Sequence, residues 1–379
     1  MIILLLLLTL LLPVATQAEG LLTPAANPPV PLFQDNPIIN GAMEVWQRGT
    51  SFTGVSTGTY VADRWAYTQG AAGAVVDITR STNVPTVAQA SILFNYSLDI
   101  DVTTADASIA AGDYHILQQV VEGYNWRPFA QKPFVFSFWV RDTITGEHAV
   151  SFRNSGVNRT YIATYSISTA DTWEYKVVLI PASPSAGTWD YTTGTGITIA
   201  FAMSAGSNFQ TTAGAWQTGN FLGTSTTVNS MSSTSNFFRV TGVKLESTSV
   251  ANPGPFRPFG TELELCQRYY QKSFLYATTP AQSVGAGTGE FTFPALQAGA
   301  TAQRSPQTTF PVQMRIAPTM TLYNPSAANG AIRDETAAAD LTATASVATD
   351  RGVHFTGTGA AGTAIANLLG IHWSANADF

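Results

Sequence analysis

Five residues near the start of the sequence have side chains that could recognise a sugar: Trp46, Arg48, Asp63, Arg64 and Trp65. Indole faces stack on sugar rings, and guanidinium and carboxylate groups form hydrogen bonds with sugar hydroxyls. The same residue types also form a packed corner of a β-sandwich, in which the charged pair is buried and mutually satisfied beside the indole rings. We favour the structural role for this set, which we call the polar-aromatic cluster, and keep sugar binding as the alternative.

A second candidate site lies in residues 204–236, a long stretch rich in Ser, Thr, Gly and Asn. Long connections in compact domains are often functional. The candidate ligand-binding residues in this stretch are Phe209, Trp216, Asn220 and Phe221. If they bind a ligand, removing Trp216 should weaken cell adsorption without lowering the melting temperature. The alternative is a low-complexity loop whose aromatic side chains pack back onto the sandwich or onto a neighbouring subunit.

The residues that usually bind metals do not form a recognisable pattern. His115, His148, His354 and His372 lie far apart, and none has the spacing of a zinc-binding motif. The single cysteine, Cys266, excludes an intramolecular disulfide framework and any site with several thiolates. We therefore expect neither a metal site nor a cofactor.

Two short strings match catalytic motifs, but their surroundings do not fit. Residues 54–58 read Gly-Val-Ser-Thr-Gly, as in the nucleophile elbow of α/β-hydrolases, which needs a strand before it and a helix after it. The flanking residues here indicate a turn. Residues 357–362 match GxGxxG, yet the 17 residues that follow are too few for a dinucleotide-binding unit, so we expect a glycine-rich hairpin loop. We expect no enzyme; glycoside cleavage would need paired carboxylates in a cleft.

The composition limits the partners and the number of domains. The 379 residues include 45% hydrophobic residues, enough for the cores of two or three domains. Charged residues make up only 11%, the formal net charge is −6, and no basic run is present. Nucleic-acid binding requires a cluster of positive charge, so we exclude DNA and RNA as partners.

The N-terminal region is expected to differ from the rest of the chain. Residues 1–18 contain an apolar run, Ile2 to Leu12, that is too short to span a bilayer, so we expect no stable membrane span. This segment resembles a signal sequence or an anchor, and a misassigned start is the third possibility. Residues 19–35 are rich in proline and predict an extended linker.

The pattern beyond the linker predicts an all-β protein. Runs of aromatic and β-branched residues between turn-forming residues indicate strands. In residues 36–257 the predicted strands include 134–140, 173–180, 197–203 and 237–246. Gly242 interrupts the last of these and indicates a β-bulge. We expect an antiparallel, jelly-roll-like β-sandwich.

A short linking helix and a second β-sandwich domain should follow. Thr261 and Glu264 have the spacing of a capping box, and the predicted helix covers 262–272 within a linking segment, 258–274. Residues 275–379 form the second, smaller β domain. Its predicted strands are 290–293, 308–315, 319–323, 352–355 and 370–373.

Several of these segments together resemble phage tail-fibre and virion appendage proteins that carry a β-sandwich similar to a carbohydrate-binding module. The similar segments are 36–41 (Asn-Pro-Ile-Ile-Asn-Gly), 46–52, 62–65, 240–246, 255–256, 262–263, 266–270, 310–312, 314–315, 317–319 and 373–378. The resemblance implies a virion protein, often a homotrimer, that contacts other virion proteins through its N-terminal region and binds a bacterial surface glycan. It provides no ligand-binding residues that can be assigned position by position.

Three hypotheses follow. The leading one is a tail or head fibre protein that mediates adsorption by binding without catalysis, located in the virion. The second is a structural connector or capsid decoration that binds no receptor. The third, favoured by the apolar N-terminal run, is a secreted bacterial carbohydrate-binding protein or polysaccharide depolymerase.

Overall fold

The computed structural model describes residues 36–70, 73–346 and 348–379. They fall within one structural unit, Asp35–Phe379. The apolar segment 1–18 and the proline-rich linker 19–35, both predicted above, lie outside the described residues. Within the described residues, no helix has the length and apolar character needed to cross a membrane.

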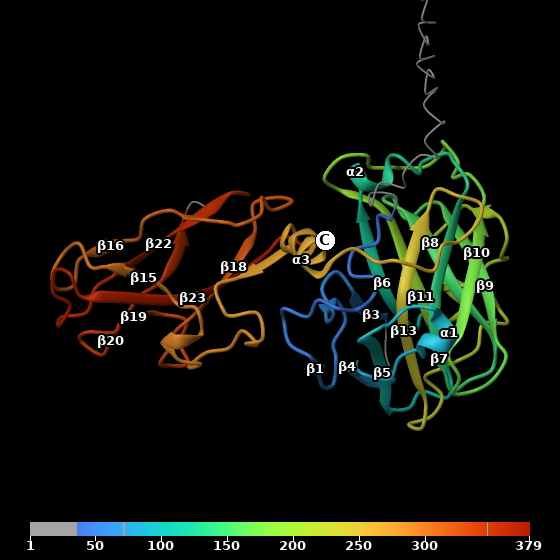
Figure 1. Ribbon diagram of the computed structural model, residues 1–379, viewed down its shortest axis with the longest axis horizontal. Helices are drawn as coiled ribbons and strands as arrows, with labels where there is room; N and C mark the ends of the chain where they lie inside the picture. The colour runs from blue at the N-terminus through green and yellow to red at the C-terminus, as the bar shows by residue number, and fades with distance from the viewer. Residues whose placement is uncertain (1–35, 71–72, 347) are drawn as a thin grey trace, which may run out of the picture. The chain divides into compact units, whose positions relative to one another are not determined.

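The first part of the fold consists of two antiparallel sheets (Figure 1). The first sheet has the spatial order β1 (Ser51–Phe52), β4 (Val75–Ser81), β5 (Ser97–Thr104), β13 (Phe237–Glu246), β7 (Phe134–Asp142) and β10 (Glu174–Ile180). The second sheet has the order β12 (Trp216–Gln217), β9 (Thr160–Ile167), β8 (Gly146–Asn154), β11 (Thr195–Ala205), β6 (Tyr114–Glu122), β3 (Ala66–Gly70) and β2 (Thr59–Tyr60). The predicted antiparallel β-sandwich is confirmed.

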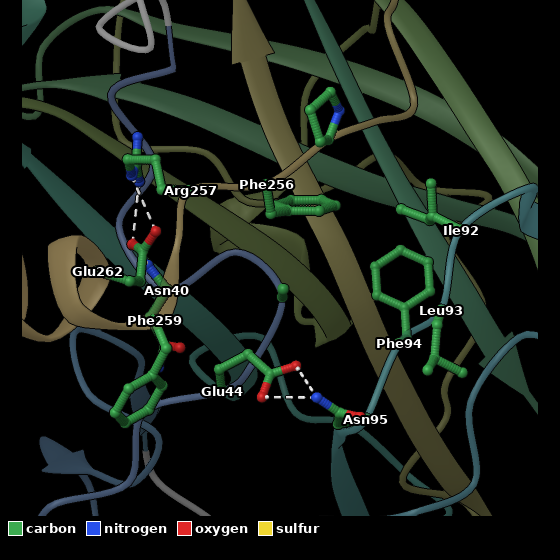
Figure 2. Close-up of a pocket in the computed structure, with 12 residues that line it drawn as sticks. Asn40, Glu44, Ile92, Leu93, Phe94, Asn95, Phe256, Arg257, Phe259 and Glu262 are labelled. Atoms are coloured by element: carbon green, nitrogen blue, oxygen red, sulfur yellow. Dashed lines mark hydrogen bonds and ion pairs between the residues drawn. The ribbon is translucent and has the colours of Figure 1, made fainter.

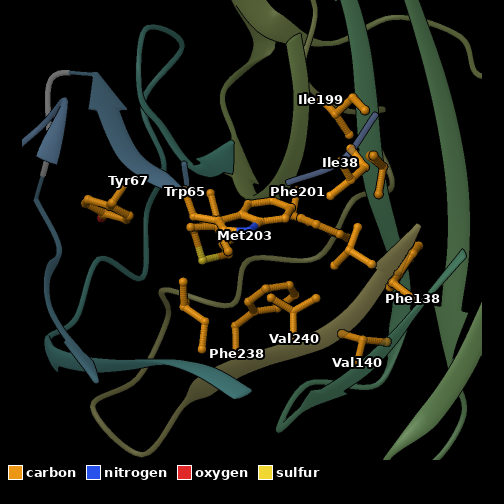
Figure 3. Close-up of a cluster of buried hydrophobic side chains, with 14 of the residues drawn as sticks. Ile38, Trp65, Tyr67, Phe138, Val140, Ile199, Phe201, Met203, Phe238 and Val240 are labelled. Atoms are coloured by element: carbon orange, nitrogen blue, oxygen red, sulfur yellow. The ribbon is translucent and has the colours of Figure 1, made fainter. Parts of the chain in front are cut away.

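Large apolar side chains from both sheets fill the space between them. Phe201 from β11 and Phe238 from β13 meet there with ring centroids 5.8 Å apart (Figure 3). Trp65 is fully buried in the same cluster, and its ring centroid lies 6.2 Å from that of Phe201. Because neighbouring residues of a strand point to opposite faces, this core also decides which side chains face outward.

The predicted bulge at Gly242 is confirmed. The register between β13 and β7 shifts between Thr241 and Lys244, and Gly242 adopts a φ of +67°. A Cβ at this position would lie 2.9 Å from the ring of Phe94. The bulge therefore requires glycine both for its backbone conformation and for the close approach of an aromatic ring.

Helices are short and lie outside the sheets. They are α1 (Val87–Ala90), α2 (Gly123–Trp126), α3 (Phe259–Gln267) and two 3₁₀ turns, η2 (Ser207–Phe209) and η3 (Ala286–Thr288). The predicted extent of the linking helix, 262–272, was wrong at both ends. Pro258 occupies the N-cap position without a side-chain capping bond, so Thr261 lies inside the helix. The helix ends before β14 (Tyr270–Lys272), because that segment pairs with a C-terminal strand.

The C-terminal part consists of two further sets of antiparallel strands. In one, β23 (Leu368–Asn376) pairs with β14, β15 (Phe291–Pro294), β18 (Thr319–Tyr323) and β19 (Ile332–Asp334), and β19 also pairs with β20 (Ala339–Leu341). In the other, β22 (Gly352–Thr358) pairs with β16 (Ala302–Arg304), β17 (Thr308–Thr309) and β21 (Thr344–Ser346). These strands have their own hydrophobic core, which includes Phe293, Phe355 and Trp373.

Two local predictions in this part were wrong. The predicted strand 308–315 is reduced to β17, because Pro311 has no N–H to donate to a strand partner. The glycine-rich stretch 357–362 does not form a hairpin loop. It connects β22 to β23, and these two strands belong to different sheets.

One half-buried acidic group, Glu290, makes the stability of the C-terminal strands depend on pH. The carboxyl group of Glu290 lies against Gly370 of β23, where a Cβ would overlap it. Burial and the neighbouring Glu335 raise the pKa of Glu290 to about 7. Folding therefore favours the protonated form, and the resulting stabilisation is present at acidic pH and is lost as the pH rises through about 7.

We expect Glu290→Gln to cancel this loss, because glutamine is uncharged at every pH. The melting temperature of the variant minus that of the wild type should be larger at pH 8 than at pH 5, as measured by circular dichroism. Glu264→Gln changes an exposed glutamate and serves as the control. An equal difference between Glu290→Gln and wild type at both pH values would contradict the assignment.

Candidate functional site

The two tryptophans of the polar-aromatic cluster are buried. The indole N–H of Trp46 donates to the carbonyl of Met43 at 2.6 Å, and that of Trp65 donates to the carbonyl of Asn40 at 3.1 Å. Both rings belong to the main core. Neither ring therefore offers a free face to a sugar in this structure.

The two arginines of the cluster share one carboxylate near the C-terminus. Arg64 pairs with Asp378 and not with its sequence neighbour Asp63. Its guanidinium also lies 3.5 Å from the ring centroid of Tyr269 and donates to the carbonyl of Val120. Burial alone would lower the pKa of Arg64, but Asp378 raises it above its ordinary value.

Arg48 completes the network. Its guanidinium lies 2.6 Å from Asp378, 3.6 Å from Asp63 and 3.7 Å from the ring centroid of Tyr270. Burial raises the pKa of Asp63, although Arg48 opposes this shift. The charged members of the cluster thus connect the first strands of the sandwich to the last residues of the chain.

Asp378→Asn should destabilise the fold strongly, because it leaves two buried guanidinium groups without their shared carboxylate. The side chains of Arg64 and Asp378 are 1% and 2% exposed. Breaking a buried ion pair of this kind costs about 3–5 kcal/mol of the free energy of unfolding, measurable by urea denaturation.

The control for this variant is Asp171→Asn. Asp171 pairs with Arg141 at 2.7 Å but is 56% exposed, and the loss of an exposed pair costs about 1 kcal/mol or less. Similar small losses for the two variants would show that the Asp378 network is not a stabilising element.

The stretch 204–236, which we call the long loop, lies on the outer face of the second sheet. Phe209 and Phe221 pack on a buried cluster that includes Ile116 of β6 and Ala149 of β8. The ring centroid of Phe209 lies 4.8 Å from that of Tyr114 in an edge-to-face arrangement. The loop aromatics thus pack back onto the sandwich, as the alternative above expected.

The remaining predicted ligand-binding residues of the loop lie in two other places. Trp216 is half-buried, with its ring centroid 5.7 Å from that of Tyr161 and 5.9 Å from that of Trp189. Asn220 is exposed, and its side-chain oxygen accepts a hydrogen bond from Arg153 at 3.2 Å. Phe209, Asn220 and Phe221 therefore lie on the outer face of the second sheet, whereas Trp216 packs separately against Tyr161 and Trp189.

For Trp216 the packing leads to a different expectation from the sequence. Trp216→Ala should lower the free energy of unfolding by about 2 kcal/mol, since a half-buried indole loses part of the 3–5 kcal/mol typical of a core tryptophan. A denaturant titration measures this loss. Leu93→Ala, at an exposed position, is the control. An unchanged stability would mean that the indole is free to serve a ligand.

Two neighbouring hollows open beside this loop. Most of their lining residues lie in the predicted stretch 204–236, but none is among the four ligand-binding residues predicted there. Their volumes are about 320 Å³ and 670 Å³, and both are lined by Ser207 and Gln210. In the larger hollow most other lining side chains carry hydroxyl groups, and in the smaller one Ser204, Thr227 and Asn229 supply hydroxyl and amide groups beside apolar residues. We call these the loop hollows. In the larger one, Glu147 of β8 accepts hydrogen bonds from Thr224 at 2.7 Å and from Thr226 at 2.6 Å.

A row of polar side chains lies at the other end of β8 on the same outer face. Arg153 donates to Gln118 at 2.9 Å, and Gln118 donates to Thr68 of β3 at 3.2 Å. We call Thr68, Gln118, Arg153 and Asn220 the polar row. Only Asn220 was among the predicted site residues, and no motif in β8 pointed to Glu147 or Arg153.

A third hollow lies beside α3 (Figure 2) and has a volume of about 320 Å³. Phe94 and Phe256 line it, together with two carboxylates, Glu44 and Glu262. Glu262 is engaged by Arg257 at 2.8 and 3.0 Å. Glu44 accepts hydrogen bonds from the Asn95 side chain, and burial raises its pKa.

The two carboxylates of this third hollow are therefore not equivalent. Glu262 also accepts a hydrogen bond from the backbone N–H of Asn40, so its oxygens hold the start of the sandwich against α3. Glycoside cleavage by a general acid and a second carboxylate needs both groups available to the substrate. Glu44 is the one carboxylate of this lining that forms no ion pair among the described residues.

The described residues contain no group of three or more His, Cys, Asp or Glu side chains placed to hold a metal ion. Cys266 is buried, and burial raises the pKa of its thiol well above the ordinary value. A thiol in this state is a poor nucleophile.

No protein-family model and no curated protein sequence matches the chain. Solved structures similar to it include the enzymatically active domain of tailspike protein 4 from bacteriophage CBA120, with 15% identity and a TM-score of 0.28. That match covers 52% of this chain and 21% of the tailspike chain.

Two bacterial structures are similar over their whole length. A putative sugar binding protein from Bacteroides thetaiotaomicron has 12% identity and a TM-score of 0.33, over 56% of this chain and 100% of its own. A family 11 carbohydrate-binding module from Clostridium thermocellum has 13% identity and a TM-score of 0.27, over 52% of this chain and 96% of its own. Each likeness concerns the fold and no more.

Proposed function

We propose that this chain is a non-catalytic virion appendage protein that binds a bacterial surface glycan through the outer face of the second sheet. The observation that carries the proposal is the pair of loop hollows, because hydroxyl and amide groups line both of them and a carboxylate lines the larger one. Sugars present many hydroxyl groups, and such side chains form hydrogen bonds with hydroxyls as both donors and acceptors. The larger hollow, at about 670 Å³, has the size of a ligand site.

The proposal is for binding without reaction. Among the described residues that line the loop hollows, Glu147 is the one carboxylate. Glycoside hydrolysis ordinarily uses two carboxylates on opposite sides of the bond to be cleaved. A single acidic group that already accepts two hydrogen bonds from threonine hydroxyls is suited to orienting sugar hydroxyls.

The location in a virion and the homotrimeric state rest on the segments that resemble phage tail-fibre proteins, such as 36–41 and 266–270. A shallow polar site binds one glycan weakly, and three copies on one particle would raise the avidity through effective concentration. The N-terminal region would then contact other virion proteins.

Other functions make different predictions for simple experiments. A connector or capsid decoration would be buried between other proteins in an image of the particle, whereas a receptor-binding fibre would be distal. A secreted protein would begin near Glu19 in its mature form, and a depolymerase would release reducing ends from capsule or lipopolysaccharide.

A pair of matched variants tests the loop hollows. Ser225 is exposed and lines the larger hollow, so Ser225→Trp should fill it and lower glycan binding at least tenfold without lowering the melting temperature. Ser235 is exposed in the same long connection but lines neither loop hollow, so Ser235→Trp is the control. The measurement is binding to an array of bacterial polysaccharide fragments, with the melting temperature as a check on folding.

Two results would contradict the proposal. If Ser225→Trp binds like the wild type, the loop hollows are not the glycan site. If the wild-type protein binds no glycan of the array in trimeric or multivalent form, the proposed function itself fails.

A further inference from the structure

Arg153 is buried on the outer face of β8, where the alternation of the strand places it. Val150 and Phe152 point into the main core, whereas Ala149 packs under the long loop. Arg153 therefore points to the loop side of the sheet, as Glu147 does. Only 9% of Arg153 is exposed.

The guanidinium of Arg153 has neutral partners only. It donates to the side-chain oxygen of Asn220 at 3.2 Å and to that of Gln118 at 2.9 Å. Its buried Nε has no hydrogen-bond partner among the described residues. An arginine side chain carries five N–H donors. Two hydrogen bonds leave most of this capacity unused.

Arg64 shows how the same protein treats a buried arginine with a structural role. Arg64 is 1% exposed, and the side chain of Arg257, which pairs with Glu262, is 9% exposed. Arg64 has the carboxylate of Asp378. Arg153 forms no ion pair with a carboxylate among the described residues.

An unpaired buried charge is costly to the fold. Burial lowers the pKa of Arg153 to about 10, so the guanidinium still carries its charge at neutral pH. The protein therefore maintains a positive charge without a counterion at a position that the loop partly covers. An anionic group from outside the chain would supply the missing partner.

We propose that Arg153 binds the carboxylate of a uronic acid in the glycan, an inference that rests on the proposed function and names its substrate class. Asn220 is exposed, and its amide oxygen occupies one of the positions that a ligand oxygen would take on the guanidinium. A planar guanidinium matches a carboxylate through two parallel hydrogen bonds. Gln118 and Thr68, next in the polar row, are placed to bind the hydroxyls of the same sugar.

The position of Arg153 also indicates a polymer as the ligand. Glu147 in the larger loop hollow and Arg153 lie six residues apart on one face of β8. At about 3.3 Å per residue this separation is roughly 20 Å. A ligand that contacts both ends must span several sugar units, with its acidic sugar at the Arg153 end.

The experiment uses the full-length protein and an array of uronate-bearing bacterial capsular oligosaccharides. Each oligosaccharide is also printed after chemical reduction of its carboxyl groups to neutral hydroxymethyl groups. Sulfated oligosaccharides without uronate form a third set. The wild type should bind native uronate forms at least tenfold more tightly than their reduced forms or the sulfated set.

The matched variants are Arg153→Gln and Arg153→Lys. Arg153→Gln should abolish the preference for the native form without lowering the melting temperature, because it removes an uncompensated charge. Arg153→Lys keeps the charge but loses the planar fork, and should retain part of the preference. The comparison of native with reduced glycans uses the wild-type protein alone, so it tests the inference even if a variant does not fold.

The possible failures are separable. The inference is overturned if the wild type binds native and reduced glycans equally, or if the Arg153→Gln protein keeps the preference. The proposed function still holds in that case if the wild type binds glycans and Ser225→Trp blocks this binding. Equal binding of sulfated glycans overturns the assignment to a carboxylate. If the wild type binds no glycan at all, the inference and the proposed function both fail.

Discussion

The packing between the two sheets of the sandwich is the constraint on which the other features depend. Trp65, Phe201 and Phe238 fill the core, and their burial fixes the face to which every second residue of the strands points. In β8 this sends Phe152 inward, while Glu147 and Arg153 point outward. A shift of one residue in register would exchange these two sets. The chemistry of the outer face is therefore specified by the aromatic core behind it.

Much of this arrangement can be predicted from the sequence, because it depends on local patterns. The aromatic and β-branched runs around Phe136 and Phe201 identify central strands, and Gly242 marks the bulge. The linking helix is less predictable. The capping pattern at Thr261 is not used, because the helix begins at Phe259 and Thr261 lies inside it. The predicted helical extent to residue 272 fails because residues 270–272 pair with β23 as a strand.

The partners of the charged residues could not be predicted, for a physical reason. Arg64 and Asp63 are adjacent, yet successive side chains diverge, and Arg64 meets a carboxylate 314 positions away. The loop shows the same limit. Its aromatic residues suggested a ligand platform, but apolar rings gain more from packing on Ala149 and Ile116 than from exposure to water. Only the fold reveals that hydroxyl groups, and not rings, line the loop hollows.

Arg64 and Arg153 illustrate how a fold distinguishes a structural arginine from one that is available for binding. Arg64 has its carboxylate within the chain, so its charge is neutralised before any ligand arrives. Arg153 has the amides of Asn220 and Gln118, which satisfy hydrogen bonds without neutralising the charge. Amide oxygens can be displaced by an anion at small cost, because the exposed amide regains hydrogen bonds to water. A carboxylate from the same chain would have neutralised the guanidinium and left no vacant position for an anionic ligand. A buried charge without a counterion on an outer sheet face is thus a physical criterion for a binding residue, and a buried charge with a carboxylate partner from the same chain is one for a structural residue.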